Sequence, residues 1–237
     1  MLRGLLPGIR AGSVQVWAVD PKGGMELGPG RSLFTRYEDA SPEAMVELLE
    51  DAVAVLQRRA RRLKDSGVRR LVPSVAESFV LVVVDELAAL TAYQADRKLK
   101  ARADVAIQLL TSQGRAPGVC LLAALQDPAK EVLPYRNLFP VRVALRLDEP
   151  GQADMVLGAH ARERGARCDQ IPPSLPGVGY VKVDGVREPV RVRAAWVTDA
   201  DITAMTTTAD VVDAVAPDAF TAIVSGLDTG PPAAAAT

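Results

Sequence analysis

The stretch Phe79-Val-Leu-Val-Val-Val-Asp85-Glu86 decides the fold of this chain. An apolar, mostly β-branched run leads directly into two adjacent carboxylates. A run of this kind is typical of a strand buried on both faces, as in a parallel sheet covered by helices. Carboxylates at the carboxyl end of such a strand lie at the sheet edge where α/β proteins bind ligands. The stretch therefore predicts an α/β fold with a candidate site at Asp85 and Glu86.

Two interpretations fit these acids. In nucleotide-driven motors, one acid at this position holds Mg²⁺ and the other acts on the attacking water. The alternative is a buried strand followed by a helix whose first turn carries acids, because carboxylates favour the positive end of a helix dipole. The stretch alone does not separate the two.

The composition describes a globular chain without an unusual charge. Its 237 residues suit one sizeable α/β domain with appendages. Apolar residues make up 49% and aromatic residues only 4%, so the expected core is built from Val, Leu and Ala. Because the net charge is −1, contact with nucleic acid requires local basic patches or a ring with a basic lumen.

Cysteine and histidine usage narrows the chemistry. Cys120 and Cys168 lack a metal-type spacing and fit a reduced, cytoplasmic protein. His160 is the single histidine, which excludes a His-based metal cluster and leaves a Ser/His triad unsupported. No apolar run approaches the ~18 residues of a membrane span, and no signal peptide is recognisable.

Hydrophobic periodicity predicts strands and helices in alternation, which is typical of a parallel α/β sheet. Residues 1–7 resemble the end of a helix closed by Pro7-Gly8. The expected strands are 13–20, 79–84, 118–125 and 140–146, and the expected hairpin pairs 178–183 with 190–194. The expected helices are 41–64, 96–112, 152–157 and one that begins near 199. We expect a domain over residues 1–205 and a disordered Thr/Ala/Pro-rich tail over 206–237.

A basic cluster ends the helix expected over 41–64, and its members are Arg58, Arg59, Arg61, Arg62 and Lys64. We interpret it as a solvated face, because cations suit a helix C-terminus. A DNA-binding patch is the alternative.

Polar residues follow three successive strands: Asp20 with Lys22, then Asp85 with Glu86, then Gln126. A nucleotide site on such a sheet also needs backbone N–H groups and a lysine, which a G-x-x-x-x-G-K-[ST] loop before a helix supplies. That pattern is absent. Gly23-Gly24 is the nearest glycine cluster, and it is followed by neither a helix pattern nor a Lys-Ser/Thr pair.

The chain resembles the FtsK/SpoIIIE family of DNA translocases, most closely its TraB-like actinobacterial plasmid-transfer type. Its first 200 residues carry, in the family's order, Val16-Trp-Ala-Val-Asp20-Pro-Lys22, Val82-Val-Val-Asp85-Glu86-Leu, Gly114-Arg-Ala-Pro-Gly118-Val, Leu122-Ala-Ala-Leu-Gln126, Arg136-Asn137 and Pro140-Val-Arg142. The resemblance implies a RecA-like P-loop NTPase fold. It also implies hexameric rings around double-stranded DNA, driven by ATP and Mg²⁺.

The resemblance also implies roles for individual residues. Asp85 matches the Walker B acid that organises Mg²⁺, and Glu86 matches the residue that polarises the attacking water. Gln126 matches the sensor of the γ-phosphate, and Arg115 matches an arginine that reaches a neighbouring subunit's nucleotide. Asp20 and Lys22 are candidates for nucleotide contact. The positions that match the family's DNA-contacting lumen loops are Lys130, Arg136 and Asn137.

Two departures from the family pattern stand out. The Walker A loop, which precedes the helix that residues 1–7 would finish, is missing, so we expect the motor domain to lack its first strand and P-loop. We therefore expect this chain alone to bind ATP poorly. Asp154 stands where the family often has an arginine, which puts part of the subunit interface in doubt.

Three hypotheses follow. The first is an ATP-dependent motor domain of a DNA translocase, serving conjugative plasmid transfer or chromosome segregation. The second is a non-catalytic interaction module of a translocase ring, which the missing phosphate loop favours. The third is an unrelated α/β enzyme that uses Asp85 and Glu86 on a metal without a phosphate loop.

Overall fold

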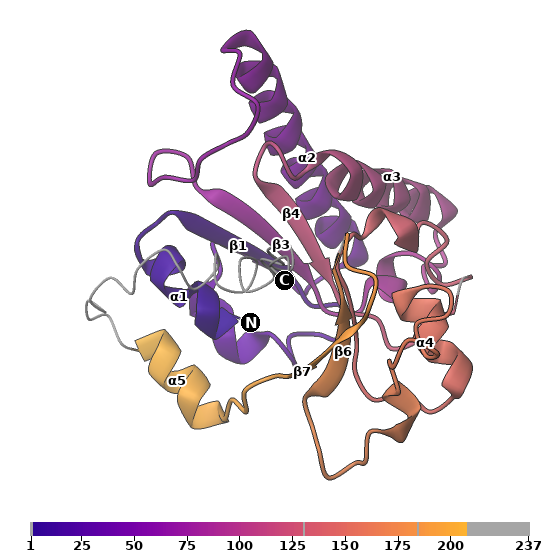
Figure 1. Cartoon of the computed structure of the whole chain (residues 1–237). Coiled ribbons are helices and arrows are strands. Elements are labelled where there is room, and N and C mark those ends of the chain that lie inside the picture. Colours follow the sequence, from indigo (N-terminus) through magenta and orange to yellow (C-terminus); the bar gives the residue numbers. More distant parts are fainter. Residues whose placement is uncertain (1, 130, 184, 208–237) are drawn as a thin grey trace, which may run out of the picture.

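A four-stranded parallel sheet forms the centre of the chain. The computed structural model describes residues 2–129, 131–183 and 185–207. The sheet has the strand order β2-β1-β3-β4, and each pair of neighbouring strands runs parallel (Figure 1). Its strands are β1 (Val14–Val19), β2 (Arg36–Glu38), β3 (Phe79–Val84) and β4 (Val119–Ala123). The predicted α/β fold is confirmed.

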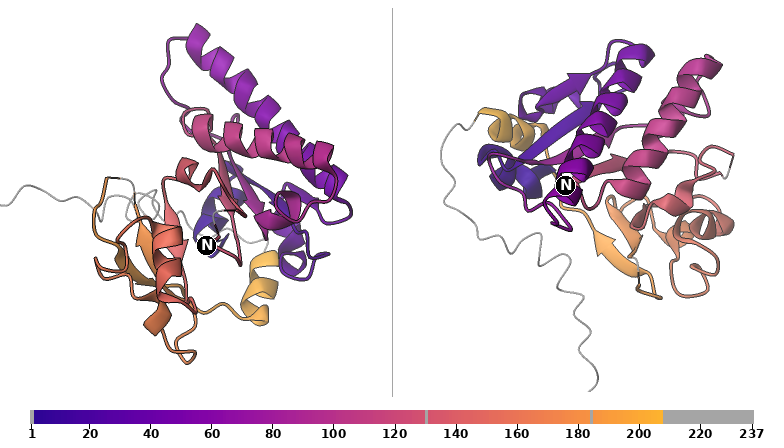
Figure 2. Two further views of the ribbon diagram at one scale, coloured as in Figure 1. Left: turned by 90° about the vertical axis from the view of Figure 1, so that its right-hand side faces the viewer. Right: turned by 90° about the horizontal axis from the view of Figure 1, so that it is seen from above.

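Two long helices cover one face of this sheet (Figure 2). They are α2 (Pro42–Asp65) and α3 (Arg97–Gln113). Every second residue of the central strands joins their apolar core, as alternation along a strand requires. The buried core residues of the strands are Trp17, Val19, Val80, Val82, Val84 and Val119.

Side-chain caps begin both helices. The Ser41 hydroxyl accepts a hydrogen bond from the N–H of Ala44, and Pro42 occupies the first helical position. The Asp96 carboxylate accepts hydrogen bonds from the N–H groups of Lys98 and Leu99. The predicted start of α2 is therefore confirmed, and α3 begins one residue after the predicted start.

The first helix continues through Pro7, so the predicted end at Pro7-Gly8 is wrong. Helix α1 spans Leu2–Arg10, and Gly12 adopts a positive φ of 73°. The N–H of Ser13 donates to the carbonyl of Gly8, and the N–H of Gly12 donates to that of Ile9. This pair of bonds forms a Schellman ending, in which Gly12 is the left-handed residue just beyond the end of the helix.

The predicted strand over 140–146 does not join the parallel sheet. Only Arg142–Ala144 is extended, as β5, and it pairs antiparallel with β6 (Val178–Lys182), which pairs with β7 (Val190–Arg193). Helix α4 (Pro150–Leu157) packs on β5 (Figure 1). The predicted hairpin is confirmed, although Asp184 in its turn lies outside the described residues.

The remaining elements are short. Helix α5 spans Asp199–Thr207, so the first two residues of the predicted tail are helical, and 208–237 lie outside the described residues. Four 3-10 turns complete the chain: η1 (Gly28–Leu33), η2 (Leu87–Leu90), η3 (Arg136–Leu138) and η4 (Cys168–Gln170). No helix in the described ranges has the length and apolar character to cross a bilayer.

Arg59 is buried, which corrects the interpretation of the whole basic cluster as a solvated face. Its guanidinium donates hydrogen bonds to the carbonyls of Ser78, Pro117 and Gly118 and forms an ion pair with Glu77. Burial lowers the pKa of Arg59 from its ordinary value. Arg59 thus joins the end of α2 to the segments that precede β3 and β4, while the other four cations of the cluster are exposed.

One edge of the parallel sheet is open at β4. Strand β4 pairs only with β3 among the described residues. The ladder between them runs from the Gly118 carbonyl, which accepts from Val80, to the Ala124 N–H, which donates to Val84. Because backbone groups alternate along a strand, Leu121 and Ala123 direct their N–H and C=O groups away from β3.

Candidate functional site

The carboxyl ends of three strands bring the predicted polar residues to one edge. The register aligns Val19 with Val84, and Val84 with Ala123. The N–H of Asp85 donates to the carbonyl of Val19 at 3.0 Å, so Asp85 follows β3 directly beside Asp20. Gln126 lies three residues beyond β4 at the same edge and is exposed.

Asp20 organises the loop that follows β1. Its side chain is buried and accepts hydrogen bonds from three backbone N–H groups, those of Lys22, Glu26 and Leu27. Gly24 makes this tight loop possible, because it has a φ of 81° and a Cβ there would lie 2.7 Å from Oδ2 of Asp39. Asp20 therefore positions Lys22, with its own carboxylate occupied by the loop.

Lys22 forms an ion pair with Asp85. Its Nζ lies 3.0 Å from Oδ2 of Asp85, and the two side chains are 33% and 21% exposed. The hydrogen bond to Asp85 raises the pKa of Lys22, with further contributions from the carboxylates of Glu26 and Glu86. The predicted metal ligand thus already faces a positive charge supplied by the chain.

Glu86 has an unusual backbone. Its φ is 98° and its ψ is 79°, a left-handed conformation that few residues other than glycine adopt. The side chain is almost fully buried, and Oε1 accepts a hydrogen bond from the N–H of Ala88 at 3.3 Å. The adjacent acids therefore diverge: Asp85 faces Lys22, and Glu86 caps η2. Strained backbone of this kind concentrates at functional sites.

The edge fits a magnesium ion that phosphates and water help to hold. Mg²⁺ in nucleotide sites commonly takes one or two carboxylates, and waters and phosphates complete its coordination. Asp85 offers a buried carboxylate oxygen that already pairs with a cation. No group of three or more His, Cys, Asp or Glu side chains in the described part of the chain could hold a metal by itself.

Of the remaining predicted residues, Arg115 lies away from this edge. Arg115 precedes β4, so it lies at the opposite, amino end of the sheet, and it is exposed. Arg136 and Asn137 belong to η3, which is part of the connection from β4 to β5. Asn137 is exposed and Arg136 is half-buried. Lys130 lies outside the described residues.

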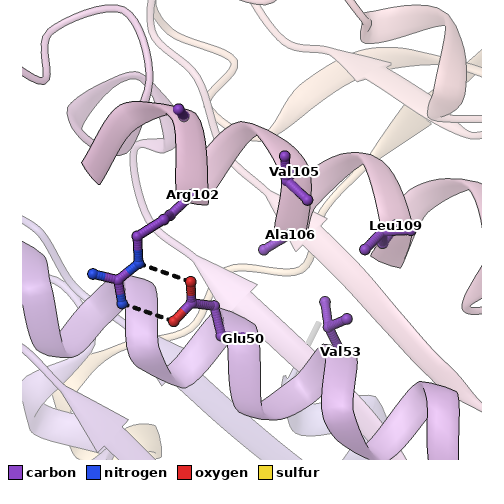
Figure 3. A pocket seen from close by; sticks show the side chains of 7 residues that line it. Glu50, Val53, Arg102, Val105, Ala106 and Leu109 are labelled. Carbon is purple, nitrogen blue, oxygen red and sulfur yellow. Dashed lines mark hydrogen bonds and ion pairs between the residues drawn. The ribbon is translucent and has the colours of Figure 1, made fainter. Parts of the chain in front are cut away.

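A surface pocket of about 360 Å³ lies between α2 and α3 (Figure 3). Arg102 lines it and forms two hydrogen bonds with Glu50. Its other lining residues are Val53, Ala101, Val105, Ala106 and Leu109. All of them belong to the two helices, so this pocket shares no residue with the Asp85 edge.

Solved structures of ATPase domains share this fold. The conjugation coupling protein TcpA of pCW3, in monomer form with ATPγS, superposes with a TM-score of 0.69 at 22% identity, over 86% of this chain and 59% of that chain. The cytoplasmic domain of the Thermomonospora curvata type VII secretion ATPase EccC superposes with a TM-score of 0.59 at 20% identity, over 85% of this chain and 27% of that chain. ATPases 2 and 3 of EssC from Geobacillus thermodenitrificans superpose with a TM-score of 0.61 at 12% identity, over 88% of this chain and 40% of that chain.

These neighbours define the class of fold. The chain has the α/β fold of P-loop ATPase domains, in agreement with the resemblance to FtsK/SpoIIIE-type translocases. It spans between 27% and 59% of the length of the three structures compared above. Neither a protein-family model nor a curated protein matches the sequence.

Proposed function

We propose that this chain is part of the ATP-dependent motor domain of a double-stranded DNA translocase, serving plasmid transfer or chromosome segregation. In this proposal, Asp85 holds Mg²⁺, Glu86 polarises the attacking water and Gln126 senses the γ-phosphate. Magnesium would neutralise charge that develops on the transferred phosphoryl group. The observation that carries the proposal is the alignment of Asp85 and Gln126 at one carboxyl edge, within a fold shared with TcpA bound to ATPγS.

A phosphate loop must complete this site, and the open edge of β4 favours one place for its strand. The backbone groups of Leu121 and Ala123 that face away from β3 pair with no other strand of the described ranges, and Leu122 is 38% exposed. An added parallel strand would satisfy these groups and end at the same carboxyl edge as Asp85, with β4 between them, where a loop of backbone N–H groups could hold phosphates. Backbone pairing of this kind is a general mode of strand addition.

The position of Arg115 supports a role in a ring. A residue at the amino end of β4 is a strand's length, roughly 17 Å for five residues, from the acids of its own subunit. Such a residue can act on a nucleotide only across a subunit interface. We propose that Arg115 stabilises the transition state of a neighbour in a hexameric, cytoplasmic ring. DNA in the lumen would contact Lys130, Arg136 and Asn137 through its phosphates.

A second candidate is a non-catalytic module that joins a translocase ring. The Lys22–Asp85 ion pair favours it, because an ammonium at Asp85 supplies the positive charge that Mg²⁺ would otherwise bring. The coding sequence upstream of Met1 discriminates between the two. A reading frame that encodes a glycine-rich Lys-Ser/Thr loop supports the motor, and an in-frame stop codon supports the module.

A further inference from the structure

Two basic side chains, those of Arg142 and Lys182, lie together at the end of α4, and Arg136 is near Arg142. Arg142 on β5 is directly opposite Lys182 on β6 in the antiparallel register, so both side chains lie on the same face. Burial lowers the pKa of Arg142, and the positive charge of Arg136 lowers it further. Like charges placed directly opposite each other destabilise a strand pair.

No carboxylate in the described part of the chain compensates these charges. None lies within 4 Å of the charged groups of Arg136, Arg142 or Lys182, whereas nearby Arg162 pairs with Asp169 at 2.8 Å. Within the same described residues, Nη1 of Arg136 and Nε of Arg142 are buried without a hydrogen-bond acceptor. Buried guanidinium N–H groups are costly when they lack an acceptor, so their position indicates a partner that the described part of the chain does not supply.

Gly158 leaves room beside two of these cations. It follows α4 with a φ of 101°, and a Cβ built on it would lie 3.5 Å from Nη2 of Arg142 and 3.9 Å from Nζ of Lys182. Both cationic groups therefore approach the same backbone position. The negative end of the α4 dipole attracts cations there. That attraction gives no acceptor to the two buried N–H groups of Arg136 and Arg142.

We propose that Arg136, Arg142 and Lys182 bind a phosphate group, at a site separate from the Asp85 edge. Guanidinium groups donate forked hydrogen bonds that match phosphate oxygens, and an ammonium adds a point charge. A bound dianion would both satisfy the two buried N–H groups and remove the repulsion across the β5–β6 pair. The phosphate can belong to a DNA backbone or to a nucleotide. The source of the phosphate depends on the function proposed above, whereas the phosphate site itself does not.

Thermal unfolding of the full chain tests the site. Sodium phosphate is compared with sodium chloride at equal ionic strength, for the wild type, Arg142→Gln and Lys182→Gln. The control variants Arg191→Gln and Arg193→Gln remove exposed cations from β7. At a tenfold excess over Kd, we expect phosphate to raise the Tm of the wild type and controls by about 3–6 °C. The shift should fall below one third of that value in the two site variants.

The Tm values measured in sodium chloride give a second readout. Because Arg142→Gln removes an uncompensated charge, we expect its Tm in chloride to equal or exceed that of the wild type. If Arg142→Gln fails to fold, Lys182→Gln decides alone. Absence of a phosphate-specific shift in the wild type, or equal shifts in site and control variants, overturns the proposal.

Competition experiments identify the source of the phosphate. A short duplex DNA that displaces phosphate from the wild type assigns the site to the DNA backbone, and displacement by ATP assigns it to a nucleotide. Either result supports the site. A third outcome is that phosphate raises the Tm of all variants equally while only Arg136→Gln loses DNA binding. Arg136 would then contact DNA as proposed, and the phosphate site would be rejected.

Discussion

Nζ of Lys22 lies 3.0 Å from Oδ2 of Asp85, across the ends of two neighbouring parallel strands. The acid proposed to hold Mg²⁺ therefore has an internal counter-ion. Asp20 fixes the loop that carries Lys22, so the pairing depends on the buried Asp20 carboxylate. A metal at Asp85 must compete with this ammonium or displace it.

Lys22→Met should strengthen cation binding at this edge. The substitution keeps the length of the side chain and removes the charge that repels a divalent ion. We expect Mn²⁺ affinity, measured by electron paramagnetic resonance, to increase roughly three- to tenfold, the scale of two unit charges about 4 Å apart in water. The exposed Lys98→Met is the charge-matched control. Equal affinities in Lys22→Met and Lys98→Met would show that Asp85 is not a cation site.

Glu86→Gly should leave the stability of the folded chain nearly unchanged. Glycine relieves the positive φ of residue 86 but removes the carboxylate cap on Ala88. Because the left-handed strain is on the order of 1 kcal/mol and the cap contributes about as much, we expect a free energy of unfolding within about 1 kcal/mol of wild type in urea.

In a protein with a complete phosphate loop, Glu86→Gln should retain nucleotide and lose hydrolysis. Wild-type hydrolysis in Glu86→Gln would remove Glu86 from the mechanism.

Arg59→Met should destabilise the chain strongly, whereas Arg58→Met should not. Arg59 satisfies three carbonyls and Glu77 in a buried position, and its loss leaves those acceptors without donors. We expect a loss of about 3 kcal/mol in urea unfolding for Arg59→Met and under about 0.5 kcal/mol for the exposed Arg58→Met. Similar losses for both variants would mean that the Arg59 contacts contribute little.

Tyr37 predicts a pH dependence of stability. Burial raises the pKa of Tyr37 to about 12, and the carboxylates of Asp39 and Asp20 add to the shift. Since the folded state holds the phenolic proton more tightly than the unfolded state, this contribution is complete below about pH 10 and disappears as pH rises towards 12. Between about pH 10 and 12, Tyr37→Phe should therefore lose less stability than the wild type. Absorbance at 295 nm should show one fewer late-titrating tyrosine in Tyr37→Phe; an unchanged curve would contradict the assignment.

Mixing inactive variants tests whether Arg115 acts across a subunit interface. In a ring with complete phosphate loops, Arg115→Ala and Glu86→Gln subunits should each be inactive. A mixture creates interfaces that combine an intact Glu86 with an intact Arg115 of the neighbour. We expect turnover to recover to at most about one quarter of wild type under random mixing in a heterologous ring. If the mixture stays inactive although mixed rings form, Arg115 does not act in trans.

The apolar runs made the parallel sheet predictable. The stretch from Phe79 to Val84 and the run that contains β4 are strongly β-branched or aliphatic, and their pairing follows from the α/β rhythm. Strand β5 was misplaced because its alternation is equally compatible with an antiparallel edge. The strand β2 was missed, since its three residues carry no hydrophobic pattern.

Tertiary contacts decided what the sequence pattern could not. Arg59 stands in the same basic run as exposed cations, but it lies on the helix face that carries Leu56 and Leu63, and it is hydrogen-bonded to residues 78, 117 and 118. The pairing of Lys22 with Asp85 depends on the register between β1 and β3. Arg142 and Lys182 are forty residues apart, so the pairing of β5 with β6 was needed to bring them together.

Titration calorimetry with Mg-ATP tests the central claim most directly. It compares the 237-residue chain alone with the same chain preceded by a strand and a phosphate loop of the G-x-x-x-x-G-K-[ST] type, each with and without Asp85→Asn. We predict no measurable binding to the chain alone, and binding to the extended protein that Asp85→Asn weakens at least tenfold. Micromolar binding to the chain alone, or binding to the extended protein that ignores Asp85→Asn, would contradict a magnesium–triphosphate site at this edge.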